Sequence, residues 1–437
     1  MVGGSSPSAA TYLDIIQSSF NISRCGEIGI HVRLRCVCRK VWRFKSSHRH
    51  RFMTNFRRPY LIVPKLIQQP TWGGDYIAKL KQLERLTFMS KYRIGQSYEL
   101  FSGTKLLSGI IDTNDSKFCP ELGFADITDL VSENFSLVEK DYVNLSDLIC
   151  ENPKSVLGQK NVDKFGTLSL LIKINQSKGN SYQLHVKPGT IDPKWKAKPE
   201  SWYYLENGLL TCGIRPGTSI NEYKKVCLGV DTYMHDLSRQ VLDGTISLEL
   251  ARENAKDFVK NNNPLNFVNF VEAKQFDVFD MSRGGLHHSW EEDDVRLPLG
   301  NVIYEVQVDQ MDPVSTLRSF DQGKIKSDGT VRDLTIDDYF KYLDYTEETN
   351  NLSNVRQSSI STPYYKMDIL NIEGKVKMAL PNSFVHLYVR EGVVDIETND
   401  GSVHVAAGYS CFVPFEAMNI LISSKVARSV VLSTYLP

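Results

Sequence analysis

From Tyr60 to its end, the sequence is built largely of short apolar and β-branched runs separated by clusters of Gly, Asn, Asp and Ser. Runs of this length, bounded by such turn formers, indicate strands. Residues 168–174 and 181–186 are predicted to be two strands joined by a turn, and 202–205 and 209–214 to form a hairpin. The pattern therefore predicts a mainly β protein with many short strands.

One stretch replaces this β pattern with the apolar spacing that is typical of helices. Residues 219–262 have that spacing, and Ser219 or Asn221 is placed to cap the first helix. Strand-like runs return after residue 262. We therefore predict a helical insert at 219–262 within a β domain formed by 59–218 and 263–321.

The last part of the sequence divides into a polar segment and a second β block. Residues 322–362 are rich in Asp, Lys, Ser and Thr, and are predicted to be a linker with one short helix near Ile336 to Leu343. After Pro363, short strands alternate with regular turns, which is typical of a sandwich or jelly roll. Residues 363–437 are therefore predicted to form a C-terminal β domain.

The charge of the chain is unevenly distributed. The 51 Lys and Arg balance the 51 Asp and Glu, but residues 1–58 carry a net charge of +9 and the remainder −9. A basic arm with interleaved aromatic residues could bind nucleic acid. We favour the alternative that 1–58 is a disordered or non-native extension, and we expect no nucleic-acid partner.

The apolar runs and the cysteines bear on where the protein works. No stretch approaches the roughly 20 apolar residues that a membrane-spanning helix needs. The eight cysteines are scattered through a large chain, which favours free thiols in a reducing compartment. The sequence therefore predicts a cytoplasmic protein that does not associate with membranes.

The residues that most suggest chemistry lie on two of the predicted strands. Gln183 and His185 are two positions apart, so in a strand their side chains point the same way. Glu200 follows at the start of the next strand, close to Lys198, and His287 comes after a glycine-rich turn. Two imidazoles, one carboxylate and one amide oxygen would form a mixed site suited to zinc. On spacing alone this signal is weak.

These segments occur in one order that resembles type I mannose-6-phosphate isomerase, or phosphomannose isomerase, a zinc-dependent cupin family. The resemblance extends over about 375 residues. The motifs that carry it are Trp72-Gly73-Gly74, Ile94 to Glu99, Leu171-Ile172-Lys173, Gln183 to Pro188, Lys198 to Tyr203, Cys212 to Gly217, Asp277 to His287, Tyr304 to Gln307 and Leu317 to Asp321. It implies cupin-type jelly-roll barrels, one in a catalytic domain formed by 59–218 and 263–321 and a cupin-like one at the C-terminus.

The resemblance also implies a function and a set of site residues. It implies one zinc ion per subunit, and an isomerase that interconverts mannose 6-phosphate and fructose 6-phosphate through a cis-enediol in mannose metabolism. The ligands carried over to this sequence are Gln183, His185, Glu200 and His287. The catalytic residues carried over are Arg318, the active-site arginine, and Lys198, a candidate proton carrier whose neutral form a nearby divalent cation would favour.

One departure from the family pattern keeps other functions open. The loop Met281 to Leu286, which presents His287, differs from the family's, and the adjacent His288 is an alternative fourth ligand. The chain could therefore be a non-catalytic or redirected metal cupin that binds sugar phosphates, or an isomerase of another sugar phosphate. The expected partner is a small anionic sugar phosphate, which Arg318, Lys198 and Lys173 would attract against the net charge of −9. We expect a monomer or a weak homo-oligomer.

Overall fold

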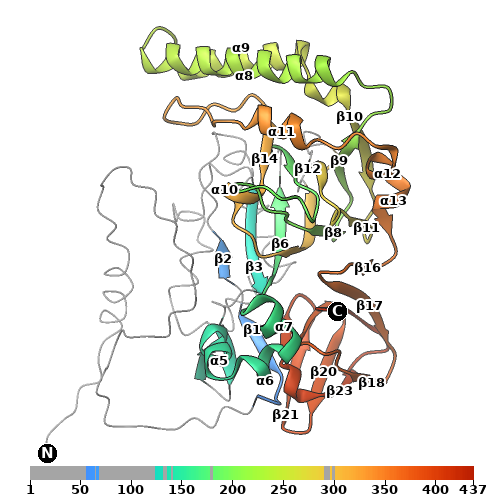
Figure 1. The fold of residues 1–437 in the computed structure, drawn as a ribbon. Coiled ribbons are helices and arrows are strands. Elements are labelled where there is room, and N and C mark those ends of the chain that lie inside the picture. The colour runs from blue at the N-terminus through green and yellow to red at the C-terminus, as the bar shows by residue number, and fades with distance from the viewer. Residues whose placement is uncertain are drawn as a thin grey trace, which may run out of the picture. The chain divides into compact units, whose positions relative to one another are not determined.

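The computed structural model describes residues 56–63, 65–67, 124–130, 135–138, 141–177, 181–289, 296–297 and 301–437, all within the compact unit Phe52–Pro437. Figure 1 shows that strands dominate these residues, which confirms the prediction of a mainly β protein. Most of the basic extension and the motifs at Trp72 and Ile94 lie outside the described residues. Every described strand pair is antiparallel, and the strands form four sheets rather than closed barrels.

Two of the sheets face each other and carry the candidate site residues, and together they are called the site half. The five-stranded sheet runs in the order β10 (Val268–Ala273), β9 (Gly208–Ile214), β12 (Gly285–Ser289), β7 (Tyr182–His185) and β14 (Leu317–Phe320). The seven-stranded sheet runs in the order β15 (Arg356–Gln357), β11 (Val278–Asp280), β8 (Glu200–Tyr204), β13 (Asn301–Val308), β6 (Leu170–Ser177), β3 (Phe124–Leu130) and β2 (Lys65–Ile67). Side chains from their facing sides meet between them, as Glu200 of β8 does with His185 of β7.

The two predicted strand pairs are wrong as hairpins, because the chain changes sheet at each turn. Strands β6 and β8 belong to the seven-stranded sheet, whereas β7 and β9 belong to the five-stranded sheet. At the second corner, the Asn301 side chain accepts from the Leu209 amide at 2.7 Å and donates to the Leu209 carbonyl at 2.5 Å. A Cβ on Gly208 would lie 2.2 Å from the Asn301 Oδ1, so only glycine fits there. Alternation identifies strands, but it does not identify their partners.

The helical insert is present and covers the outer side of the five-stranded sheet. It comprises α8 (Ile220–Leu242) and α9 (Leu248–Asn261), and Ser219 caps α8 by accepting a hydrogen bond from the Glu222 amide. Apolar residues of α8 such as Tyr223 and Met234 share a buried cluster with Leu184 of β7. The insert therefore packs against the outer side of β7, the strand that carries two candidate ligands.

The segment predicted to be a linker is packed against the site half. Its expected short helix is α11 (Ile336–Tyr342), whose Tyr339 is fully buried in the same cluster as α8. It also contributes β15, which pairs with β11. The remaining helical elements are α5 (Leu145–Glu151), α6 (Pro153–Leu157), α7 (Gln159–Phe165), η2 (Pro264–Phe267), α10 (Asp312–Ser315), α12 (Glu347–Asn350), α13 (Leu352–Val355) and η3 (Phe415–Ala417).

The C-terminal half consists of the other two sheets with an apolar core between them. The eight-stranded sheet runs in the order β16 (Ile360–Ser361), β17 (Lys366–Ile372), β24 (Ser429–Tyr435), β19 (Val385–Glu391), β22 (Ser410–Val413), β1 (Tyr60–Val63), β4 (Phe135–Val138) and β5 (Asp141–Asn144). The four-stranded sheet runs in the order β18 (Lys375–Ala379), β23 (Asn419–Ser424), β20 (Val393–Thr398) and β21 (Gly401–Ala406). Strand β1 pairs directly with β22, so this sheet combines the first described strands with the last.

Buried polar contacts join the C-terminal half to the site half. The Tyr304 hydroxyl of β13 lies 3.1 Å from His386 Nδ1 of β19, and the Ser201 hydroxyl of β8 lies 3.0 Å from that of Tyr365. His404, by contrast, is exposed and pairs with Asp395 at 2.8 Å. Neither histidine belongs to a group of metal-ligating side chains among the described residues.

Within the described part of the chain, none of the helices is both long and apolar enough to span a membrane. Cys150, Cys212, Cys227 and Cys411 are free thiols.

Candidate metal centre

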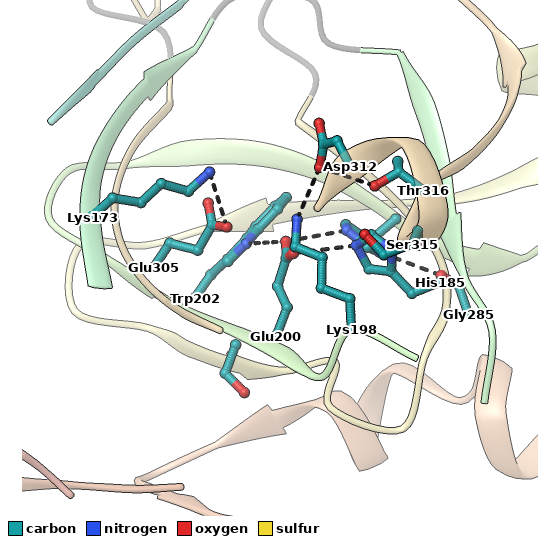
Figure 2. Close-up of polar contacts among 12 residues, drawn as sticks. Lys173, His185, Lys198, Glu200, Trp202, Gly285, Glu305, Asp312, Ser315 and Thr316 are labelled. Atoms are coloured by element: carbon teal, nitrogen blue, oxygen red, sulfur yellow. Dashed lines mark hydrogen bonds and ion pairs between the residues drawn. The ribbon is translucent and has the colours of Figure 1, made fainter. Parts of the chain in front are cut away.

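Three buried side chains converge between the two sheets of the site half. The His185 Nε2 lies 3.2 Å from one Glu200 carboxylate oxygen, and the His287 Nε2 lies 3.2 Å from the other. One ligand atom from each of the three residues lies within 4.8 Å of the other two. Figure 2 shows Glu200 between the side chains of Trp202 and His185. Two imidazole nitrogens and a carboxylate at this separation are a donor set that zinc prefers.

The register of neighbouring strands brings the two histidines together. Strand β12 pairs with β7 so that Gly285 is opposite His185 and His287 is opposite Gln183. The preceding turn needs glycine, because Gly284 has a φ of +81° and a Cβ there would lie 2.7 Å from the His185 carbonyl. The loop that departs from the family pattern therefore still delivers His287 to the cluster.

On His185, a hydrogen bond on the side of the ring away from Glu200 determines which ring nitrogen faces the carboxylate. The Ser315 carbonyl lies 2.6 Å from His185 Nδ1. Because a carbonyl only accepts, Nδ1 carries the proton, and the Nε2 lone pair of the neutral ring points at the carboxylate. Burial also lowers the pKa of His185 to about 4, so this ring is neutral at physiological pH.

In this arrangement a nitrogen lone pair faces a negatively charged carboxylate oxygen. A cation between them would remove the repulsion. The Nε2 lone pair of His185 and the carboxylate oxygen repel each other unless a cation lies between them. The His287 Nε2 is buried and has no hydrogen-bond partner, although buried polar atoms are normally satisfied. The three residues therefore fit a bound divalent metal ion.

Two other side chains hold the Glu200 carboxylate in place. The Trp202 Nε1 donates to Oε1 at 2.8 Å, and the Lys198 ammonium lies 3.3 Å from Oε2. Burial alone would raise the pKa of Glu200, but Lys198 and the two histidines together outweigh it and hold that pKa well below its usual range. Glu200 is therefore ionised and available as a ligand.

Lys198 is linked through Asp312 to Arg318. The Asp312 carboxylate lies 3.5 Å from the Lys198 Nζ and 3.2 Å from an Arg318 guanidinium nitrogen. Burial would lower the pKa of Lys198, but Glu200 and Asp312 reverse the direction and raise it. This is opposite to the expectation of a neutral lysine, because the chain surrounds Lys198 with carboxylates.

The remaining predicted residues occupy defined places beside the cluster. Gln183 is opposite His287 on one side and Arg318 on the other, in one row across β12, β7 and β14. His288 instead belongs to the opposite side of β12, where Gln322 donates to its Nε2 at 2.8 Å. The structure thus brings His287, and not His288, to Glu200.

The sequence did not indicate several residues that complete this site. Trp202 lies two positions after Glu200, and only this spacing could have suggested the contact between them. Ser315 and Asp312 contact His185 and Lys198 from more than 100 positions away along the chain, and no local pattern marks them. Glu305 lies 3.2 Å from Lys173, on adjacent strands that only the fold places side by side.

Comparisons with known proteins support this architecture. The sequence matches no protein-family model and no curated protein. Its fold, however, is similar to that of a structure from Archaeoglobus fulgidus solved as a candidate mannosephosphate isomerase, at 14% identity and a TM-score of 0.52, covering 87% of this chain and 98% of that one.

Two further solved structures give the same result. One is an alanine variant of phosphomannose isomerase from Salmonella typhimurium, at 13% identity and a TM-score of 0.55, covering 86% of this chain and 99% of that one. The other is a zinc-bound mannose 6-phosphate isomerase, at 12% identity and a TM-score of 0.55, with the same coverage. At such identities the likeness concerns the fold. The chain therefore has the cupin-type fold of the phosphomannose isomerases, with a buried His–Glu–His cluster between its two facing sheets.

Proposed function

We propose that this chain is a zinc-dependent aldose–ketose isomerase that interconverts mannose 6-phosphate and fructose 6-phosphate. The observation that carries the proposal is the buried cluster of His185, Glu200 and His287, in which the His287 Nε2 lies 3.2 Å from the carboxylate without making a hydrogen bond. A lysine and an arginine lie beside it, and the chain shares its fold with zinc-bound mannose 6-phosphate isomerase.

The proposed zinc ligands are His185, Glu200, His287 and Gln183. Gln183 completes the set because it is the cross-strand neighbour of His287 and lies two positions from His185 on the same side of β7. When bound, the ion would supply positive charge for the oxygens of an enediolate, the intermediate that is hardest to form in this reaction. The Ser315 carbonyl and the Trp202 indole keep His185 and Glu200 oriented for binding.

Lys198 is the proposed proton carrier between C1 and C2 of the sugar. Its ammonium lies between the Glu200 and Asp312 carboxylates, so it is held charged and can donate a proton. When Glu200 serves as a ligand, part of its negative charge is neutralised. It then raises the pKa of Lys198 less than the free carboxylate does. The lysine can then also take up a proton, as an isomerase needs in the opposite direction.

Arg318 is the proposed anion-binding residue of the site. Asp312 and the Ser181 hydroxyl hold its guanidinium at 3.2 Å and 3.1 Å, which fixes its direction before substrate arrives. A planar guanidinium fits either the phosphate or a developing oxyanion. Fixed cations at the site would also counter the net negative charge that the chain carries beyond residue 58.

The free thiols of the described part are consistent with work in a reducing compartment. We accordingly propose a cytoplasmic enzyme of mannose metabolism.

The proposal is tested with the purified full chain, its zinc content and a panel of aldose phosphates. We expect isomerisation of mannose 6-phosphate to fructose 6-phosphate, loss of turnover on chelation, and recovery on addition of one equivalent of zinc. Turnover of another sugar phosphate alone would reassign the substrate. A protein that binds zinc and sugar phosphate but forms no ketose would be a non-catalytic metal cupin, and full turnover after chelation would disprove the metal-dependent scheme.

A further inference from the structure

Gln307 has a buried carboxamide oxygen that the proposed mechanism does not use. The side chain lies on β13 and is 3% exposed. Its Oε1 is buried and has no hydrogen-bond partner. An amide oxygen removed from water without a donor is costly, and each such group calls for an explanation.

The strand register places Gln307 directly beside the metal centre. It is opposite Glu200 of β8 on one side and opposite Leu171 of β6 on the other. Directly opposed residues of antiparallel strands share a side of the sheet, so Gln307 and the ligand Glu200 both face the space between the two sheets. The next row on this side contains Glu305, paired with Lys173 at 3.2 Å.

These neighbours do not satisfy the amide oxygen of Gln307. Leu171 has an apolar side chain, the Glu200 carboxylate can only accept, and the ammonium of Lys173 lies 3.2 Å from Glu305 and makes no hydrogen bond to the Gln307 Oε1. A molecule that enters the space between the sheets can supply the missing donor. A sugar carries several hydroxyl donors, and a site built to bind a hydroxyl discriminates strongly against analogues that lack it.

We propose that Gln307 is a substrate-binding residue whose Oε1 accepts a hydrogen bond from the hydroxyl on C3 or C4 of the sugar phosphate. These carbons do not react, so Gln307 fixes the position and stereochemistry of the sugar while other residues act on C1 and C2. The inference rests on the proposed function, because it takes a sugar phosphate as the ligand.

The test is a binding cycle that needs no turnover. The ligand is mannitol 6-phosphate, which has the hydroxyls of the open-chain sugar but no carbonyl to isomerise, together with its 3-deoxy and 4-deoxy forms. The proteins are the zinc-loaded full chain, Gln307→Met, which keeps the length of the side chain but removes the oxygen, and Gln275→Met as a matched control. Gln275 lies in an exposed turn, where its Nε2 donates to the Leu205 carbonyl.

We expect Gln307→Met to bind mannitol 6-phosphate about tenfold more weakly, and Gln275→Met to bind it as the wild type does. One of the two deoxy forms should bind the wild type about tenfold more weakly than mannitol 6-phosphate does. The same deoxy form should bind Gln307→Met no more weakly than it binds the wild type, because the variant and the analogue remove the same hydrogen bond. Zinc affinity, measured by competition with a chelator, should be unchanged.

Several outcomes would overturn the inference. A Gln307→Met protein with weakened zinc binding would place the residue in the metal centre instead. Should the variant not fold, the wild type alone decides, because equal affinity for all three polyols would exclude a contact to either hydroxyl. If the wild type isomerises mannose 6-phosphate and Gln307→Met binds every ligand normally, only this inference is overturned. If the wild type binds no sugar phosphate, the proposed function is overturned.

Discussion

The indole of Trp202 donates a 2.8 Å hydrogen bond to the same Glu200 oxygen that lies 3.2 Å from the His287 Nε2. The Trp202 ring also packs edge-on against the His287 ring, with centroids 5.5 Å apart. One buried aromatic side chain thus orients two candidate ligands from two different sheets. Residues of this kind tune metal affinity without touching the ion.

Replacing Trp202 with Phe should weaken zinc binding by a factor of about 10 to 100, because Glu200 loses its donor while the ring packing largely remains. Competitive titration with a chelator measures the affinity, and circular dichroism checks the fold. Trp195→Phe is the control, because the Trp195 Nε1 donates to Asp338 away from the site. Equal zinc affinities for the two variants would contradict the role given to Trp202.

Replacing Lys198 with Met should lower kcat by a factor of about 10² to 10⁴ while zinc content stays at one equivalent, because the proposed proton carrier is lost. Coupled kinetics and metal analysis provide the measurements. Lys194→Met, which removes a surface lysine paired with Asp338 at 3.1 Å, should leave kcat unchanged. A Lys198→Met enzyme with a kcat within a factor of ten of wild type would exclude Lys198 as the carrier.

The sequence predicts the element types, because these leave local signals, whereas the set of candidate ligands depends on the resemblance to a known family, because the spacing of the ligands alone is a weak signal. The spacing of Gln183 and His185 places them on one side of a strand, and Ser219 marks the start of α8 as predicted. The sheet to which a strand belongs leaves no such signal. For this reason the sequence wrongly predicts that β8 and β9 pair with each other. The contacts of Ser315 and Asp312 depend on long-range packing, and their short helix carries no ligand motif of its own.

Replacing Asn301 with Ala should lower the free energy of unfolding by about 2–4 kcal/mol, because it removes the amide that ties β13 to β9 and leaves the buried Leu209 amide and carbonyl unpaired. Urea unfolding of the zinc-free protein measures the change. Asn261→Ala, which removes an exposed side chain at the end of α9, should cost under about 0.5 kcal/mol. Similar losses for the two variants would show that the corner is not held by Asn301.

Stability of the zinc-free chain should fall as the pH drops from 6.5 toward 4, in part because of His185. Its pKa is lowered to about 4 in the folded state against an ordinary value of 6.5, so the unfolded chain binds more protons across that window. Acid therefore favours unfolding, and His185 accounts for about 2–3 kcal/mol between pH 7 and 4.5.

The measurement for His185 compares urea unfolding of the wild type and His185→Asn at both pH values, with chelator present. The variant has no imidazole at this position, so the wild type should lose more stability than the variant between pH 7 and 4.5. Other titrating groups contribute equally to both proteins and cancel. If the free energies of unfolding of the two proteins differ by the same amount at both pH values, the His185 ring is not held neutral by burial.

The pairing of β1 with β22 has a consequence for synthesis on the ribosome. Leu61 pairs with Cys411, about 350 positions later, so the first described strand has no neighbour on that side until almost the whole chain has been translated. At about 5–20 residues per second, this wait lasts roughly 20 to 70 seconds. During that time the apolar strand Tyr60–Val63 has an unpaired edge, and a nascent chain with such an edge is a natural client for a chaperone.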